Sequence, residues 1–131
     1  MNLKRVIIAD QSQQLLEGIR CLLNTVFDSV VMVADTESML DAASRIKADM
    51  VVMNLPLGAV RIEDAIKRVR DIAPGIKVLV ISIHDDPATV RRVNSAGADG
   101  FVQKRFAAED LIPAVEQVMS GGRFFSAVQE R

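Results

Sequence analysis

The 131-residue chain contains no tryptophan, no tyrosine, one cysteine and one histidine, and its formal net charge is −1. The single cysteine, Cys21, excludes an intrachain disulfide, and its apolar helical surroundings predict a small buried residue. The only histidine, His84, has no cysteine or second histidine with which to share a metal ion, so we expect an exposed loop residue. A nearly neutral chain also gives no electrostatic reason to expect a nucleic-acid or membrane surface.

Long hydrophobic runs are also missing. The apolar run before Asp10 is too short for a signal peptide, and no later run could span a bilayer. We therefore expect a cytoplasmic protein with no membrane partner. With 131 residues, of which 50% are hydrophobic, the chain is long enough for one domain with a full core and too short for two of ordinary size.

The sequence does contain a regular alternation of short β-type runs and amphipathic helical stretches. The runs rich in valine and isoleucine predict strands at 3–9, 29–34, 50–53, 77–81 and 100–103. Apolar residues at helical spacing predict helices within 12–26, 36–46, 62–70, 87–97 and 111–119. This alternation predicts a doubly wound α/β fold, in which helices cover both faces of a five-stranded parallel sheet.

Turn and capping residues predict where several helices begin and end. Thr36 is the expected N-cap of the second helix, while Asp86 followed by Pro87 indicates the start of the fourth. Gly97 stands where that fourth helix would close. Pro113 removes a hydrogen bond from the last helix, which should therefore kink or begin irregularly before it.

Polar side chains stand at the ends of four of the predicted strands. Asp10 and Gln11 follow the first, Asn54 the third, Ser82 the fourth and Lys104 the fifth. The carboxyl ends of parallel strands lie at one edge of the sheet, which is where open α/β sheets bind their ligands. We therefore expect these side chains to cluster at that edge.

This set of residues resembles the receiver domain of bacterial response regulators, the CheY-like family, from about Leu3 to Gly121. The resemblance implies the flavodoxin-like strand order 2-1-3-4-5, a receiver domain at 1–121, and a tail or the start of a linker at 122–131. The stretch 82–104, followed by 111–126, is similar to receivers of NarL/FixJ-type (LuxR-type) transcriptional regulators. The resemblance implies that DNA is bound only by an output domain absent from this chain, and that a sensor kinase is the upstream partner.

Two positions of the family's pocket depart from its pattern. Receivers usually carry an acidic pair after the first strand and a phosphoacceptor aspartate after the third. Asp10 matches, but Gln11 replaces the acid that is the main magnesium ligand, and Asn54 occupies the phosphoacceptor position. Phosphoryl transfer needs a carboxylate nucleophile and Mg²⁺. The resemblance therefore implies a receiver that is not an enzyme and that signals through protein contacts with little or no phosphorylation.

No cofactor or metal site is expected in such a pocket. Asp10, Asn54 and Pro56 are only weak candidates for Mg²⁺, since one carboxylate replaces the family's three. In the absence of the ion, Lys104 is expected to pair with Asp10 and to donate a hydrogen bond to the side-chain carbonyl oxygen of Asn54.

The resemblance also implies that Ser82 and Phe101 are switch residues and that the first and last helices form a dimer surface. Ser82 and Lys104 match the family's hydroxyl and lysine, although a lone strand-end serine more often satisfies a backbone group. Phe101 matches the aromatic switch position and, having no hydroxyl, should turn into the core. In the resembled subfamily the first and last helices form a usable face, so we expect a weak homodimer through 16–20 and 115–119.

Two alternatives remain open. The first is an ordinary phosphorylatable receiver in which Asn54 is an engineered substitution, although this would not explain Gln11 or the early proline of the loop, Pro56. The second is a flavodoxin-like enzyme or small-ligand domain. The sequence has neither a glycine-rich phosphate loop nor a catalytic histidine or cysteine constellation, which disfavours the second alternative.

Overall fold

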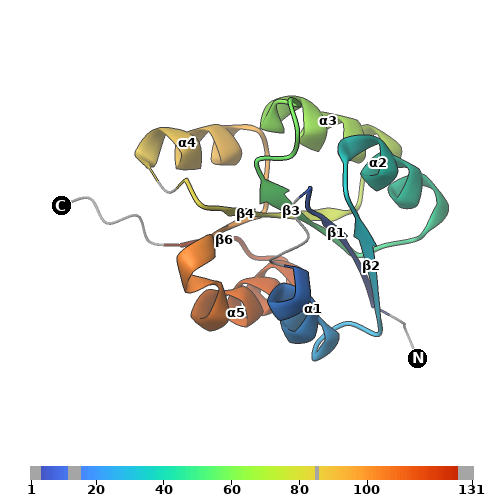
Figure 1. Ribbon diagram of the computed structural model, residues 1–131, viewed down its shortest axis with the longest axis horizontal. Coiled ribbons are helices and arrows are strands. Elements are labelled where there is room, and N and C mark those ends of the chain that lie inside the picture. Colours follow the sequence, from blue (N-terminus) through green and yellow to red (C-terminus); the bar gives the residue numbers. More distant parts are fainter. Residues whose placement is uncertain (1–3, 12–15, 85, 127–131) are drawn as a thin grey trace.

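The computed structural model describes residues 4–11, 16–84 and 86–126, and it is an open parallel sheet with helices on both faces (Figure 1). The sheet order is β2-β1-β3-β4-β5-β6. Its strands are β1 (Arg5–Ala9), β2 (Ser29–Val33), β3 (Met50–Leu55), β4 (Lys77–Ser82), β5 (Gly100–Gln103) and β6 (Phe124–Phe125). The helices are α1 (Leu16–Asn24), α2 (Thr36–Arg45), α3 (Ile62–Ile72), α4 (Pro87–Ser95) and α5 (Ala107–Met119), with a 3-10 turn, η1, at Lys104–Phe106. The predicted doubly wound α/β fold is confirmed.

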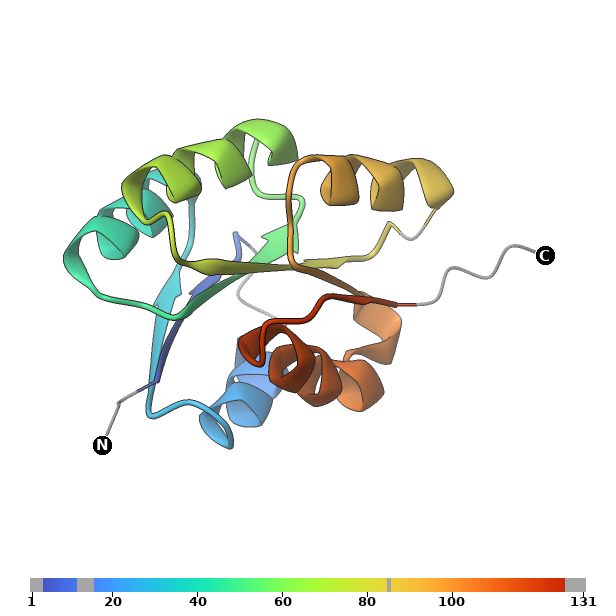
Figure 2. The ribbon, with the colours of Figure 1, turned by 180° about the vertical axis from the view of Figure 1, so that it is seen from behind.

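The predicted number of strands is wrong by one, because the sheet continues beyond β5. The additional strand β6 pairs in parallel with β5, with Gly100 opposite Phe124 and Phe101 opposite Phe125. Figure 2 shows it in red, leaving the last turn of α5 and running along the sheet. Two aromatic residues after a pair of glycines are too few to show a period-2 pattern, so no strand was predicted there.

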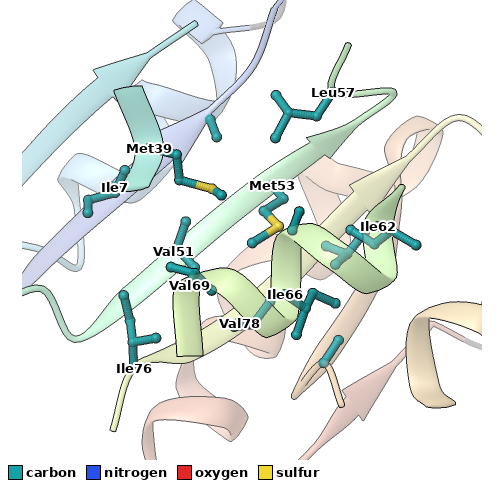
Figure 3. Packing of buried hydrophobic residues seen from close by; sticks show 14 of the residues in the cluster. Ile7, Met39, Val51, Met53, Leu57, Ile62, Ile66, Val69, Ile76 and Val78 are labelled. Carbon is teal, nitrogen blue, oxygen red and sulfur yellow. The ribbon is translucent and has the colours of Figure 1, made fainter. Parts of the chain in front are cut away.

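Each face of the sheet has its own apolar core. Successive residues of a strand point to opposite faces, so Val51 and Met53 of β3 pack under α2 and α3, whereas Met50 and Val52 pack against α1 and α5. Figure 3 shows the first of these cores, with Met53 close to Ile66 of α3. Because both faces of β3 are covered, all four of these β3 side chains are fully buried. This explains why β3 is an uninterrupted apolar run in the sequence.

The fourth helix begins and ends as its sequence predicts. The carboxylate of Asp86 accepts a hydrogen bond from the backbone N–H of Thr89 at 3.1 Å, and Pro87 is the first helical residue. The hydroxyl and then the backbone N–H of Thr89 lower the pKa of Asp86, because both hydrogen bonds favour its charged form. Gly97, with φ of +94°, follows the helix in the left-handed conformation that glycine adopts at no steric cost.

The N-cap of the second helix lies one residue earlier than predicted. Asp35, not Thr36, is the N-cap, and its carboxylate accepts a hydrogen bond from the backbone N–H of Ser38 at 2.7 Å. That backbone bond is the main reason that the pKa of Asp35 is lowered. Thr36 is the first residue of the helix and is buried. A carboxylate accepts such hydrogen bonds at least as well as a hydroxyl, which explains why Asp35 caps the helix in place of Thr36.

Two further expectations about single residues have opposite outcomes. Phe101 is fully buried, which confirms that its ring turns into the core. It stacks on Phe125 with ring centroids 6.5 Å apart. Cys21, by contrast, is exposed, so the prediction of a buried thiol is wrong. Helix α1 turns Ile19 and Leu23 inward, and a residue two positions from each lies on the opposite side of the helix.

The last helix contains its proline without interruption. Pro113 lies on the exposed side of α5, and η1 leads directly into the first turn of the helix. The irregular start expected before Pro113 is thus the 3-10 turn at Lys104–Phe106. Within the described ranges, no helix is long and apolar enough to cross a bilayer.

The burial of Phe101 predicts a large effect of truncation. Phe101→Ala should lower the free energy of unfolding by about 3–5 kcal/mol, because it empties a fully buried site and removes the stack on Phe125. The matched control is Phe106→Ala, whose ring is 42% exposed and should cost less than about 1 kcal/mol. Urea unfolding followed by circular dichroism measures both, and equal losses would contradict this packing.

Candidate functional site

Strand register brings the predicted polar residues to one edge of the sheet. Ala9 of β1 pairs with Met53 of β3, so the next residues along each strand, Asp10 and Asn54, are neighbours. Ser82 ends β4 opposite Leu55 and also pairs with Gln103, the last residue of β5. Gln11 and Lys104 directly follow these ends. Asn54 itself lies within β3, which continues to Leu55, and not after the strand as predicted.

The inner part of this edge is closed to solvent. Asp10, Asn54 and Ser82 are 1%, 3% and 1% exposed, whereas Lys104 is half-buried and Gln11 is exposed. Gln103, which was not among the predicted site residues, is also buried here. Its place as the last residue of a short strand before Lys104 was the signal that could have indicated it.

Gln11 connects the loop after β1 to the loop after β3. Its side-chain Oε1 accepts a hydrogen bond from the backbone N–H of Gly58 at 2.7 Å. Gly58 has a φ of +65°, a conformation that an ordinary L-residue rarely adopts. The amide of Gln11 therefore joins two loops that border the pocket, using a neutral acceptor at the position where the resembled family has an acid.

Ser82 makes a local hydrogen bond in this structure. Its hydroxyl oxygen accepts a hydrogen bond from the backbone N–H of His84 at 2.9 Å, which closes the turn after β4. This is the strand-end role that a serine plays by default. His84 is exposed, as predicted. Ile83, between these two residues, is 55% exposed, so a large apolar side chain faces solvent directly after β4.

The predicted contacts of Lys104 are not formed. No ion pair within the described ranges joins Lys104 to Asp10. In the same part of the chain, the buried Oδ1 of Asn54 accepts no hydrogen bond from Lys104 or from any other group. Lys104 does not extend β5 but opens the 3-10 turn η1, and its side chain is half-buried.

The residues at this edge do not fit a magnesium ion. Mg²⁺ prefers carboxylate oxygens, and among the described residues no group of three or more acidic, histidine or cysteine side chains could hold a metal. Asp10 is the carboxylate of the predicted set, while Asn54 carries an amide and Gln11 already accepts from Gly58. The buried Oδ1 of Asn54 could accept from any small donor, but it brings no negative charge to offset that of a divalent ion.

Comparison with known proteins decides the family. Residues 6–116 match the response regulator receiver domain. The chain belongs to this family. Receiver domains of response regulators serve signalling and not catalysis.

Three relatives illustrate which receivers are similar. The transcriptional regulatory protein DegU of Brevibacillus brevis is 31% identical over 122 residues, covering 92% of this chain and 52% of DegU. A LuxR-family two-component response regulator from Aurantimonas sp. SI85-9A1 has a structure with a TM-score of 0.86 at 25% identity, covering 95% of this chain and 91% of that one. The RcsB response regulator of Salmonella typhimurium has a TM-score of 0.84 at 25% identity, covering 95% of this chain and 63% of that one. The receiver spans about half the length of DegU.

Proposed function

We propose that this receiver signals through protein contacts with little or no phosphorylation. The observation that carries the proposal is the amide Asn54, 3% exposed, at the position where the resembled family has its phosphoacceptor carboxylate. An amide oxygen is a hydrogen-bond acceptor but not the anionic nucleophile that forms an acyl phosphate. The pocket therefore keeps the receiver geometry without the reacting group.

The surroundings of Asn54 support this proposal. Gln11 holds Gly58 through a neutral hydrogen bond, so the two loops are joined without an ion. Ser82 is bonded to the turn that follows it, and Lys104 forms no ion pair with Asp10 among the described residues. A ligand changes a conformational equilibrium only by binding one state better than another. With no phosphoryl group to attract Ser82 and Lys104, this pocket stays in one state.

The larger protein is proposed from the relatives. DegU is a transcriptional regulatory protein, and the RcsB structure concerns interaction with DNA. We infer that residues 1–121 act as a receiver for an output domain and that 122–131 start the connection to it. DNA would then be bound by the output domain alone, which agrees with the net charge of −1 on this chain. A sensor kinase would then act on this receiver by binding it, with little or no transfer of a phosphoryl group.

A weak homodimer through α1 and α5 is the proposed mode of association. The two helices pack against the same face of the sheet and lie side by side in Figures 1 and 2. Val115 and Val118 are fully buried in the core, so they leave Met119 and the exposed positions of α1 such as Arg20 for contact. A surface with so few apolar atoms predicts weak association.

The first test restores the missing acids one at a time. In a Mg²⁺ titration followed by amide NMR, the unmodified chain should show no saturable shifts at Asp10 or Asn54, because neutral amides do not offset the charge of the ion. Asn54→Asp alone should bind weakly, and Gln11→Asp with Asn54→Asp should bind with saturable shifts at millimolar Mg²⁺.

The controls separate the alternatives. Gln11→Asn keeps a neutral amide and should bind no Mg²⁺. Saturable binding by the unmodified chain would contradict the proposal. Full binding by Asn54→Asp alone would instead favour an ordinary receiver that carries an engineered asparagine, since Gln11 would then be compatible with the ion.

Sedimentation velocity tests the homodimer. The unmodified chain should sediment increasingly fast as its concentration is raised to the millimolar range. Arg20→Glu together with Met119→Glu should abolish that dependence, because like charges would meet across the shared face. Arg91→Glu on α4, away from this face, is the matched control. A monomer at every concentration would contradict the proposed interface.

A further inference from the structure

The segment Arg123–Ser126, which we call the strap, covers the outer edge of β5. Its two central residues form β6, and its backbone donates hydrogen bonds from Phe124 to Asp99 at 3.2 Å and from Ser126 to Phe101 at 2.8 Å. The family match ends at residue 116, before the strap begins. The edge strand of this sheet is therefore covered by the chain's own C-terminal part, although the strand order of the resembled family ends at β5.

Glycines on both sides permit this close approach. A Cβ on Gly100 would lie 2.5 Å from Cδ1 of Leu79 and 3.1 Å from the carbonyl oxygen of Phe124, so a side chain there would push the strap away. Gly121, with φ of +97°, and Gly122, whose Cβ would meet Gln117 at 2.9 Å, let the chain turn directly from α5 onto the edge. Glycines thus permit the turn that leads into the strap and the close contact between Gly100 and Phe124.

Side chains of the strap are recognised individually. Arg123 donates hydrogen bonds to Oδ1 of Asn94 and, at 2.9 Å, to the carbonyl oxygen of Ala98, and its guanidinium lies 4.8 Å from the ring centroid of Phe125. Phe125 in turn stacks on the buried Phe101. The first residue of the strap is therefore fixed to the end of α4, and the third to the core of β5.

The last residue of the strap fixes it to α5 and to the receiver pocket. Ser126 is only 4% exposed, and its hydroxyl donates to the carboxylate of Asp110 at 3.2 Å while accepting from the backbone N–H of Gln103 at 3.3 Å. Gln103 immediately precedes Lys104. A displacement of the Lys104 end of β5 therefore acts on the same backbone group that holds the strap.

We propose that the edge of β5 is a specific docking site for the chain's own Arg-Phe-Phe-Ser segment, and that docking and release of the strap is the switch that this receiver presents to the sequences following it. The docked strap leads the chain out between α4 and α5, beside the Lys104 end of β5. Release would free both the exit path and a strand edge able to pair with another extended segment. The inference does not depend on whether the pocket is phosphorylated.

A peptide experiment tests the docking site. In the full chain carrying Arg123→Ala and Phe125→Ser, an added peptide copying Gly122–Ser126 should produce saturable amide shifts at Phe101, Gln103 and Asn94. The unmodified chain should bind the peptide at least tenfold more weakly, because its own strap is present at a high effective concentration. A peptide with the same two replacements is the negative control.

A second measurement keeps the test decisive if the double variant folds poorly. Arg123→Ala alone removes an exposed side chain and should raise the hydrogen-exchange rates of the Phe124 and Ser126 amides at least fivefold. Arg91→Ala, an exposed arginine of α4 outside the strap, should leave both rates unchanged. Unprotected Phe124 and Ser126 amides in the unmodified chain, or equal peptide binding by the unmodified and variant chains, would overturn the proposal.

Discussion

The parallel pairing of β1 with β3 is the constraint on which the pocket depends. With Ala9 opposite Met53, the chain must bring Asp10 and Asn54 together at the carboxyl edge. A slip of one residue would exchange the side chains that β3 gives to its two cores, so that Val51 and Met53 would have to pack where Met50 and Val52 now pack. The position of the site therefore follows from core packing, while its chemistry follows from the single residue that ends the apolar run. In this chain that residue is the amide Asn54.

The sequence predicted the fold and the edge because both depend on long patterns. Five strands and the Asp86 cap of α4 lie close to where periodicity and capping placed them. What it missed depends on choices between tertiary partners. The hydrogen bond from Gly58 to Gln11 joins segments distant in sequence, and the turn η1 and the strand β6 contain too few residues to form a pattern.

The pocket and the strap together suggest how a receiver can act without a phosphoryl group. Neutral side chains remove the electrostatic reason for a metal ion, and the bond between Gln11 and Gly58 supplies the loop connection that remains. In the proposed function, control enters through protein surfaces. The strap is such a surface, because Ser126 contacts both Asp110 of α5 and the backbone of Gln103, next to Lys104. A partner that binds at this edge would shift the equilibrium between the docked and the released strap.

Intact-mass spectrometry after incubation with acetyl phosphate and Mg²⁺ tests the central claim most directly. The account predicts a single species with the mass of the unmodified chain, because the buried edge offers an amide where a carboxylate nucleophile is required. Incubation of the Gln11→Asp and Asn54→Asp double variant under the same conditions establishes that the donor is active. A species heavier by one phosphoryl group in the unmodified chain, mapped to Asn54 or its deamidated form, would contradict the account.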